Sequence, residues 1–437
     1  MNSQPRVNIP ESDQPRVVII GAGFAGLLLA RQLAKDNFQV VLLDKNNYHQ
    51  FQPLFYQVAM SGLEPSSIVF PLRKVFQKQA NTFIRITEVE SIDSENKRLF
   101  TPLGIVNYDY LVIATGADTN YFGNKKIEEK SIPMKSVGEA LYLRNAILED
   151  YEKSLTTEDY DKRQWLIDIV VVGGGPTGVE VSGALAEMRN YILPKDYPEL
   201  DTKEIDIYLM QGADRLLPGM SEAASAKSLK FLEDLGVQVK LNTRVVDYDG
   251  EYAYTQEGDK ILCKKLIWAA GIRGNLLKGI PEEQVAYGGR IKVDRYNRVA
   301  EMGQVYAIGD IAYMETETFP QAHPQVAQVA MQQAKQLAKN LKNELRQKEW
   351  QTFTYKDLGS MATIGRHLAV VDLPNVKFQG AFAWFVWLFV HLFQLLGVKN
   401  RVFVFLNWVW NYFTYDQSLR LIIRPRSKHS STEESSQ

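Results

Sequence analysis

Short apolar runs alternate with segments of helical spacing along most of the chain. Residues 17–20 form a continuous β-branched run, residues 27–34 show helical spacing, and residues 39–44 form a second apolar run that ends in an acid. Continuous apolar runs are typical of strands that a parallel sheet buries on both faces. The pattern predicts a strand, a helix and a second strand, which is how an α/β fold begins.

Glycines occupy the turn after the first strand in the spacing Gly21-x-Gly23-x-x-Gly26. In this arrangement one glycine makes the tight turn, one lets backbone approach a pyrophosphate, and one allows close packing of helix on strand. The helix N-terminus presents free N–H groups to the phosphates, and Asp44 is placed to bind a ribose hydroxyl. These features predict a dinucleotide site. The alternative is an α/β turn whose glycines only relieve crowding.

The same pattern recurs in the middle of the chain. A second apolar run at 169–172 leads into Gly173-x-Gly175-x-x-Gly178, followed by a helical segment and another strand. We therefore predict two nucleotide-binding units, the second inserted in the first. Two such sites predict hydride or electron transfer between two carriers, and the alternative is a duplicated scaffold with one inactive site.

Two side chains of the second unit bear on its chemistry. Glu180 lies in the first turn of the helix after the glycines, where the helix dipole alone would favour an acid. Gln211 ends the next strand, where an NAD site usually has an acid. An acid there would repel a 2′-phosphate and an amide would not, so Gln211 argues against a strict preference for NADH.

Three further apolar strands, at 108–116, 266–272 and 303–310, belong to the same two units. A strand that ends in Gly-Asp can point a carboxylate at a ribose or ribitol hydroxyl. The residues at these strand ends are candidate nucleotide contacts: Thr115, Gly116, Gly271, Gly309 and Asp310.

Two segments of the first unit need separate interpretation. Residues 45–62 are rich in aromatic and amide side chains, and we expect a loop and short helix that line the far end of the first nucleotide site. The alternative is a packed Ω-loop. Residues 84–92 and 98–101 are expected to form the strands of a hairpin.

A long helix is expected up to about residue 346. Gln328 and Gln332 are four residues apart and share one face of this helix. The small side chains of Ala327 and Ala330 leave room beside them. Two amides over small side chains can hydrogen-bond a flat heterocycle or a molecule with carbonyl groups. The alternative is a glutamine face exposed to solvent.

The C-terminal part is strongly aromatic. Residues 381–398 are almost all apolar, and residues 402–413 are rich in Phe, Trp and Tyr. A spanning helix needs about 20 apolar residues, and Trp, Tyr and His suit the headgroup boundary better than hydrocarbon. We expect an interfacial membrane anchor, with one spanning helix or a dimer core as alternatives, and a disordered tail at 427–437.

Composition narrows the function classes. The 437 residues carry a formal net charge of −1, which gives no electrostatic reason to expect nucleic acid as a partner. The single cysteine, Cys263, excludes a disulfide framework and a cysteine-pair redox relay. The histidines show no metal-ligand spacing, and residues 1–16 look like neither a secretory signal nor a transit peptide.

The two glycine turns, the strand ending in Asp310, the hexapeptide Ala-Gln-Val-Ala-Met-Gln at 327–332 and the aromatic C-terminus resemble the type II NADH:quinone oxidoreductases. These are single-subunit respiratory enzymes that do not pump protons. The resemblance covers about residues 16–424. Its nucleotide motifs are shared with the wider superfamily of flavoproteins with two dinucleotide-binding domains, and the hexapeptide and C-terminus are more specific. The chain departs from the family pattern at Gln211, Met331 and Phe55.

The resemblance implies two nucleotides and a quinone. FAD would lie in the first unit, and NADH or NADPH in the inserted unit. A quinone pocket near Gln328 and Gln332 would open to the membrane through the C-terminal helices, with Glu180 as a third catalytic candidate. The implied FAD contacts are Gly21, Gly23, Gly26, Asp44, Thr115, Gly116 and Asp310, and those of NADH are Gly173, Gly175, Gly178 and Glu180. Gly309, Gln211 and Gly271 are further candidate cofactor contacts.

The expected fold is α/β, with two Rossmann-type dinucleotide-binding domains and a membrane-associating helical region. We assign residues 1–120 and 290–348 to the FAD domain, 121–289 to the NAD(P)H domain and 349–426 to the anchor. We also expect a homodimer bound peripherally at the cytoplasmic face of the cell inner membrane. The rival functions are a sulfide:quinone or disulfide reductase, which requires paired cysteines, and a membrane-docked nucleotide-binding protein without quinone turnover.

Overall fold

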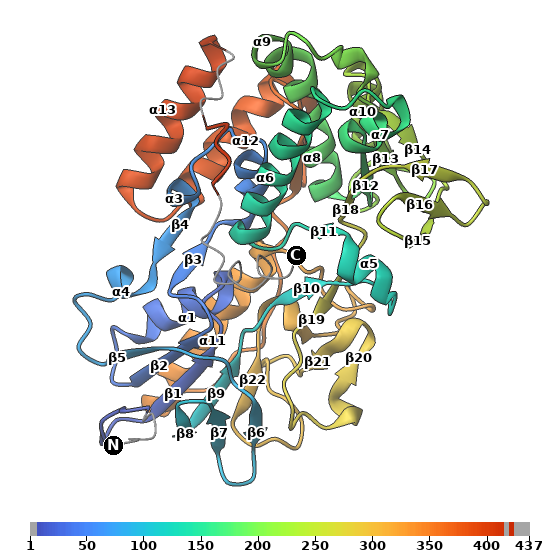
Figure 1. The fold of residues 1–437 in the computed structure, drawn as a ribbon. Coiled ribbons are helices and arrows are strands. Elements are labelled where there is room, and N and C mark those ends of the chain that lie inside the picture. The colour runs from blue at the N-terminus through green and yellow to red at the C-terminus, as the bar shows by residue number, and fades with distance from the viewer. Residues whose placement is uncertain (1–6, 415–418, 424–437) are drawn as a thin grey trace, which may run out of the picture.

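Two five-stranded parallel sheets organise the molecule (Figure 1), and four adjacent strands have the same order in both, β9-β1-β2-β5 and β18-β12-β13-β14. The structure is a computed structural model that describes residues 7–414 and 419–423. The first sheet has the order β22-β9-β1-β2-β5 and the second β11-β18-β12-β13-β14. In sequence, the strands of the second sheet lie between β9 and β22 of the first. The expected α/β fold, with one nucleotide-binding unit inserted in the other, is confirmed.

The strands of both sheets are short, and the central ones are almost fully buried, whereas the edge strands β5 and β14 are partly exposed. The bounds in the first sheet are β1 Arg16–Ile20, β2 Gln39–Asp44, β5 Thr82–Ile86, β9 Tyr110–Ile113 and β22 Val305–Ala307. Those in the second are β11 Ile132–Pro133, β12 Ile169–Val172, β13 Ile207–Met210, β14 Gln238–Lys240 and β18 Lys265–Trp268.

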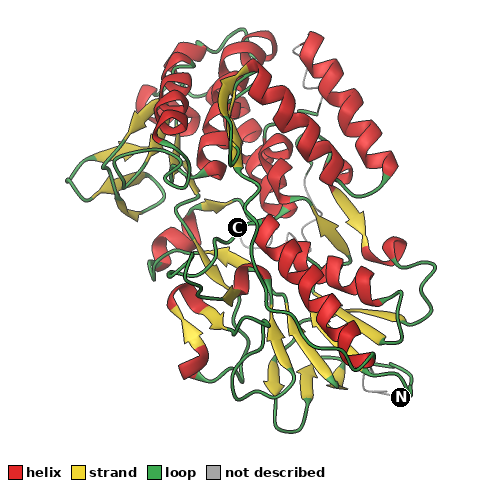
Figure 2. Ribbon diagram, turned by 180° about the vertical axis from the view of Figure 1, so that it is seen from behind, coloured by secondary structure: helices red, strands yellow, loops and turns green. Residues whose placement is uncertain are grey.

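Helices cover these sheets. On the first sheet, α1 (Phe24–Leu33) packs along α11 (Ala327–Leu345), and Figure 2 shows the helices of that layer from behind. On the second sheet, α8 (Pro176–Glu187) follows the glycine turn and packs against β13. The other helices of the inserted part are α5 Lys125–Lys130, α6 Val137–Ser154, α7 Tyr160–Ile167, α9 Leu193–Asp196 and α10 Glu222–Asp234.

Small sheets, antiparallel except for the pair of β21 and β23, complete the two units. The chain passes between the units through β10 (Ala117–Thr119), which pairs with β19 (Ile272–Gly274). The remaining strands before residue 320 are β3 Tyr48–Gln50, β4 Val69–Pro71, β6 Ser91–Asp93, β7 Arg98–Thr101, β8 Gly104–Asn107, β15 Val245–Tyr248, β16 Tyr252–Thr255, β17 Lys260–Leu262, β20 Val285–Ala286, β21 Arg290–Lys292 and β23 Ala312–Tyr313.

One strand expectation was only partly correct. Most of the segment 84–92 does not belong to a hairpin, because residues 82–86 form β5, which runs parallel to β2 at the edge of the first sheet. Only its end does: β6, which includes Ser91 and Ile92, pairs antiparallel with β7 as expected, and β8 adds a third strand. An edge strand is half-buried, so its alternating pattern resembles that of a hairpin strand.

The aromatic segment 45–62 is folded into the core. It forms β3, a 3-10 turn at Gln52–Leu54, α2 (Phe55–Ala59) and the loop after it. Phe51, Leu54 and Phe55 are buried in the hydrophobic cluster that α2 shares with α6, α8 and the C-terminal part. This packing agrees with the alternative of a packed loop, and the same segment also lines the central cavity.

The C-terminal part is built on the inserted unit. Its sheet comprises β24 (Ser360–Thr363), β25 (Ala369–Asp372) and β26 (Lys377–Gly380), and β24 packs against α8 while β25 packs against α10. Two helices follow, α12 (Ala381–Gln394) and α13 (Val398–Thr414), and α2, α3 (Pro65–Ile68) and α4 (Leu72–Val75) complete the helices. This sheet was not expected from the pattern of apolar and polar positions.

The helices α12 and α13 each have a buried face and an exposed face. Trp384, Trp387 and Trp408 are buried, whereas a row of exposed phenylalanines follows the other side of α12: Phe382, Phe385, Phe389 and Phe393. Among the described residues, no helix has both the length and the apolar character needed to cross a bilayer. The expected tail at 427–437 lies outside the described residues.

Candidate active site

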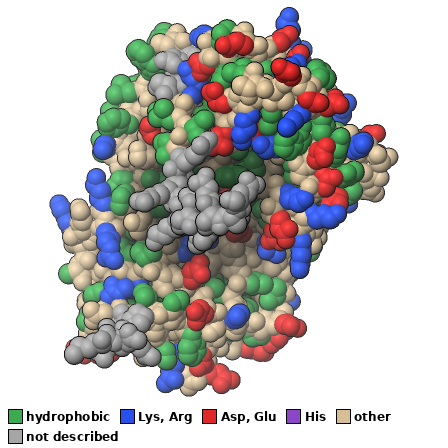
Figure 3. Space-filling view, viewed as in Figure 1, with side chains coloured by type: hydrophobic (Ala, Val, Ile, Leu, Met, Phe, Trp, Pro, Cys, Tyr) green, Lys and Arg blue, Asp and Glu red, His purple; other side chains and the backbone are tan. Residues whose placement is uncertain are grey.

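A cavity of about 1060 Å³ lies where the two units and the C-terminal part meet. Its wall includes the carboxyl ends of β1, β2, β9 and β22, the start of α8, and His391 of α12. Figure 3 shows this face hollowed at its centre, with charged side chains of both signs around it. Carboxyl ends of parallel strands are where open α/β sheets bind ligands, and the volume suits a ligand larger than most drug molecules.

The first glycine turn leaves an open space at the start of α1. Gly21 has φ +100°, and a Cβ on it would lie 2.3 Å from the Ala114 carbonyl oxygen, while a Cβ on Gly26 would lie 1.8 Å from the Gly21 carbonyl oxygen. The fold itself therefore requires these two glycines. Gly23 has φ −68°, and no atom lies within 4 Å of the position its Cβ would take. A glycine there fits a ligand that approaches the backbone.

The second glycine turn repeats this geometry. A Cβ on Gly173 would lie 2.3 Å from the Ala269 carbonyl oxygen, and one on Gly178 would lie 1.8 Å from the Gly173 carbonyl oxygen. Gly175 has φ −76° and open space around it. These glycines lie outside the wall of the cavity, which α8 reaches through Pro176, Thr177 and Glu180.

The polar side chains at the ends of β2 and β13 take equivalent positions. The Asp44 carboxylate accepts hydrogen bonds from the backbone N–H groups of Ala22 (2.6 Å) and Asn46 (2.7 Å), and its burial raises its pKa. Gln211 Oε1 accepts from the backbone N–H of Gly174 at 3.0 Å. The amide thus keeps the contact to the glycine turn but brings no negative charge.

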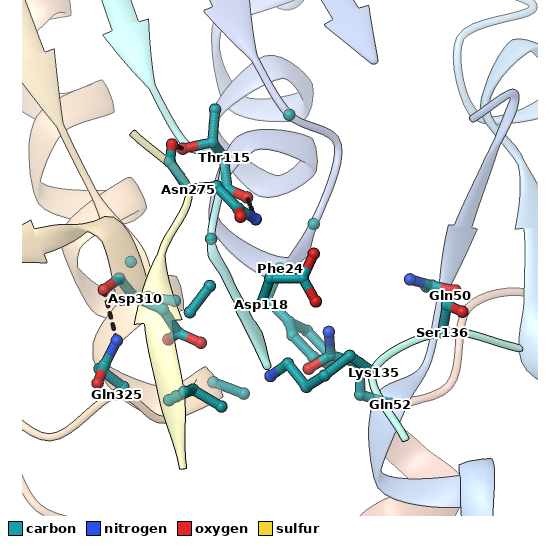
Figure 4. Close-up of a pocket in the computed structure, with 18 of the residues that line it drawn as sticks. Phe24, Gln50, Gln52, Thr115, Asp118, Lys135, Ser136, Asn275, Asp310 and Gln325 are labelled. Atoms are coloured by element: carbon teal, nitrogen blue, oxygen red, sulfur yellow. Dashed lines mark hydrogen bonds between the residues drawn. The ribbon is translucent and has the colours of Figure 1, made fainter. Parts of the chain in front are cut away.

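The candidates at the other strand ends all line the cavity. They are Thr115, Gly116, Gly271, Gly309 and Asp310. Gly309 has φ +76° and lies between Ala25 and Ala330. A Cβ added to Gly309 would be 3.4 Å from the Ala25 Cβ and 3.3 Å from the Ala330 Cβ. The Asp310 carboxylate faces the cavity (Figure 4). Burial raises the pKa of this carboxyl group, and the charges of Lys135 and Arg290 oppose that rise.

Several wall residues were not identified from the sequence. Figure 4 shows Gln50, Gln52, Asp118, Lys135, Ser136, Asn275 and Gln325 around the cavity. One signal was available, because Ser136 and Glu139 form a capping box that fixes the start of α6 beside Lys135. The others come from short strands, a 3-10 turn and loops whose position depends on tertiary packing.

Glu180 is the buried acid of the cavity wall. Its residue is 9 % exposed, and burial raises its pKa to about 8. Its carboxylate accepts a long hydrogen bond, 3.5 Å, from the backbone N–H of Thr363. The Tyr56 hydroxyl lies 3.1 Å from the Thr363 hydroxyl, so polar groups of α2, α8 and β24 meet here. Near neutral pH this carboxyl group holds its proton.

Gln328 and Gln332 are directed away from the cavity. Gln328 donates to the Gly359 carbonyl (2.8 Å) and accepts from the Leu358 N–H (3.2 Å). Gln332 donates to the Lys356 carbonyl (2.8 Å) and accepts from the Lys356 N–H (3.0 Å). Their neighbours Ala327 and Ala330 line the cavity instead. A role of the two amides in quinone binding stays a prediction, and these contacts make it indirect.

Comparisons with known proteins agree with this architecture. Residues 15–334 match the family described as pyridine nucleotide-disulphide oxidoreductase, and residues 358–415 match the NDH2 C-terminal domain. The chain is 34 % identical over 420 residues to the type II NADH:quinone oxidoreductase Ndh of Mycobacterium tuberculosis, covering 91 % of this chain and 88 % of that protein. It is 28 % identical to an internal alternative NAD(P)H-ubiquinone oxidoreductase of Arabidopsis thaliana, covering 92 % and 85 %.

Solved structures share the fold. NDH2 of Plasmodium falciparum, in complex with NADH, superposes with a TM-score of 0.86 at 24 % identity and covers 94 % of this chain and 100 % of that chain. The sulfide:quinone oxidoreductase of Aquifex aeolicus superposes with a TM-score of 0.70 at 19 % identity, covering 92 % and 95 %. At these identities the likeness supports the fold alone. The identity and coverage of the mycobacterial relative show more: this chain belongs to the type II NADH:quinone oxidoreductase family.

Proposed function

We propose that this protein oxidises NADH and reduces a membrane quinone, with FAD as its bound redox group and without pumping protons. The observation that carries the proposal is the cavity, whose wall combines the open glycine turn of the first unit, the start of α8 and the aromatic helix α12. Family membership supports the same reaction. Its balance is NADH, one proton and a quinone giving NAD⁺ and a quinol.

The residues of the first unit fit FAD. The open space at Gly23 and the N-terminus of α1 suit a pyrophosphate, and Asp44 lies at the end of β2, where a ribose is bound. Asp310 directs a carboxylate into the cavity without a hydrogen-bond partner among the described residues. When bound, FAD accepts a hydride from NADH and passes electrons to the quinone.

An anaerobic titration tests this function. NADH is expected to bleach the yellow purified protein, and a short-chain quinone is expected to restore the colour. Protein without flavin would contradict the proposal. Bleached flavin that stays bleached after quinone is added would instead favour a nucleotide-binding protein without quinone turnover.

The disulfide and sulfide chemistries of related folds lack their nucleophiles here. Both need paired cysteines, and the chain has one. Cys263 is fully buried, and burial raises the pKa of its thiol to about 12. This thiol is unsuited to attack or to disulfide exchange.

NADPH is expected to serve as a slower donor. The neutral Gln211 follows β13. The Arg244 side chain lies beside the next residue, Gly212, because its Nε is 3.7 Å from the position that a Cβ on Gly212 would take. Gln211→Glu is expected to lower kcat/KM for NADPH at least about tenfold, because a carboxylate would face the 2′-phosphate. For NADH the change is expected to stay within about threefold. Stopped-flow bleaching with each donor measures this, and equal losses for both donors would contradict it.

Glu180 is expected to hold the proton that accompanies quinone reduction. Its carboxyl group lines the cavity and stays protonated near pH 7, because burial raises its pKa to about 8. Glu180→Gln keeps the shape but has no proton to give. We expect about tenfold slower quinone reduction at pH 7, with flavin bleaching by NADH within about threefold of wild type. A variant slowed equally in both half-reactions would contradict this role.

The pH dependence of protein stability tests whether Glu180 is buried. Its pKa is about 8 in the folded chain, against an ordinary value of 4.5, so wild type loses stability as pH rises from about 4.5 to 8. Glu180→Gln removes that loss. Relative to wild type, the Tm of the variant is expected to rise by at least about 3 °C between pH 5 and pH 8. A Tm difference that does not change with pH would contradict the burial of a titrating acid.

We also propose that the reaction takes place at a membrane surface. The exposed aromatic side chains of α12 and α13 suit the surface of a bilayer, from which a quinone would enter the cavity. A peripheral position at the cytoplasmic face of the cell inner membrane and a homodimer stay predictions.

A further inference from the structure

Helix α12 contributes one ring to the wall of the cavity. This ring is His391, which stacks on Trp387 with a centroid distance of 4.0 Å and an interplanar angle of 24°. Phe51 meets it edge-on at 6.2 Å. Trp387 is buried and Phe51 belongs to the same core, so two aromatic neighbours fix the orientation of the imidazole.

The backbone of α12 decides which nitrogen of His391 carries the proton. Nδ1 lies 2.8 Å from the Trp387 carbonyl oxygen. A carbonyl oxygen can only accept a hydrogen bond, so Nδ1 is the protonated nitrogen of the neutral ring. Burial lowers the pKa of His391 to about 4, and no charged side chain contributes to that shift. At pH 7 the ring is therefore neutral and Nε2 has a free lone pair.

This lone pair discriminates between the two forms of a quinone. Among the described residues, the Trp387 carbonyl is the hydrogen-bond partner of the His391 ring. A quinone oxygen only accepts hydrogen bonds, so it gains nothing from an acceptor nitrogen. Each hydroxyl group of the quinol donates one.

We propose that His391 Nε2 accepts a hydrogen bond from a hydroxyl group of the quinol, so that this wall of the cavity binds the reduced product better than the quinone. The inference rests on the proposed function, because it concerns the second substrate of that reaction. A tenfold preference for the quinol would raise the potential of the bound two-electron couple by about 30 mV. His391 would thus favour electron transfer to the quinone without itself reacting.

The test compares two ligands on the oxidised, FAD-loaded protein without oxygen. A short-chain benzoquinone and its hydroquinone are each titrated by equilibrium dialysis. His391→Phe keeps a ring that stacks on Trp387 and removes both nitrogens. We expect its Kd for the hydroquinone to rise about three- to tenfold, which is the value of one hydrogen bond. The Kd for the benzoquinone is expected to stay within about twofold.

His391→Gln is the matched variant, because a carboxamide both donates and accepts. Its Kd for the hydroquinone is expected to stay within about threefold of the wild-type value. Its Kd for the benzoquinone is expected to be lower than that of wild type. Equal weakening of both ligands by His391→Phe, or no change in either, would overturn the inference. Failure of both ligands to bind wild-type protein would instead reject the proposed function. An unchanged visible spectrum of the flavin confirms that each variant is folded.

Discussion

Gly23→Leu is expected to give a folded protein that is colourless. The φ of residue 23 is −68°, which any residue adopts, and a Cβ there would meet no protein atom within 4 Å. The substitution therefore leaves the fold intact and fills only the space that a pyrophosphate would occupy at the N-terminus of α1. Excluding the phosphates is expected to weaken FAD binding at least about 100-fold, or about 3 kcal/mol.

Gly175→Leu is the matched control, because its surroundings in the second turn are the same. This variant is expected to be yellow, to bind FAD like wild type, and to resist bleaching by NADH. Its photoreduced flavin is still expected to be reoxidised by a quinone. The flavin content of each purified protein and stopped-flow bleaching measure the two effects. If Gly23→Leu retained FAD, or if Gly175→Leu lost it, the assignment of the two nucleotides to the two units would be wrong.

The nucleotide turns could be predicted because their determinants are local. The spacing of Gly21, Gly23 and Gly26 dictates a strand, turn and helix within a few residues, and the same holds for the second turn. The sequence could not separate the glycines that the fold requires from the one that a ligand requires. That distinction depends on Ala114, whose carbonyl oxygen faces Gly21 across the sheet.

The proposed quinone site was harder to predict because its candidate residues come from distant segments. Helical spacing shows that Gln328 and Gln332 share a face, but it does not show which way that face points. In the structure it contacts the segment 355–359. His391 and Lys135 reach the cavity only because α12 and the start of α6 pack beside it. No local pattern marks His391, and the capping box of Ser136 and Glu139 marks only the start of the helix beside Lys135.

The exposed aromatic row of α12 should hold the protein on lipid vesicles. Phe385, Phe389 and Phe393 are 52 %, 64 % and 56 % exposed. They follow one face of α12, and the opposite face carries buried tryptophans. Burying about half of a Phe side chain is worth about 1 to 1.5 kcal/mol. Replacing all three with serine is therefore expected to weaken binding to neutral vesicles at least about 100-fold. Because all three rings are more than half exposed, flavin content and bleaching by NADH should be retained.

Two controls accompany this experiment. Substitutions elsewhere on the surface test whether any loss of exposed apolar side chains releases the protein, and high salt tests whether charge holds it on the vesicle. Tyr287→Ser and Ile105→Ser remove exposed apolar side chains elsewhere, at 89 % and 51 % exposure, and are expected to sediment with vesicles like wild type. High salt should release little wild-type protein, because apolar contact is not screened by ions whereas charge attraction is. If the triple variant still sedimented, the row on α12 would not be the anchor. If it were released but reduced short-chain quinones at the wild-type rate, then α12 would combine two separable roles, with its exposed face holding the membrane and His391 facing the substrate.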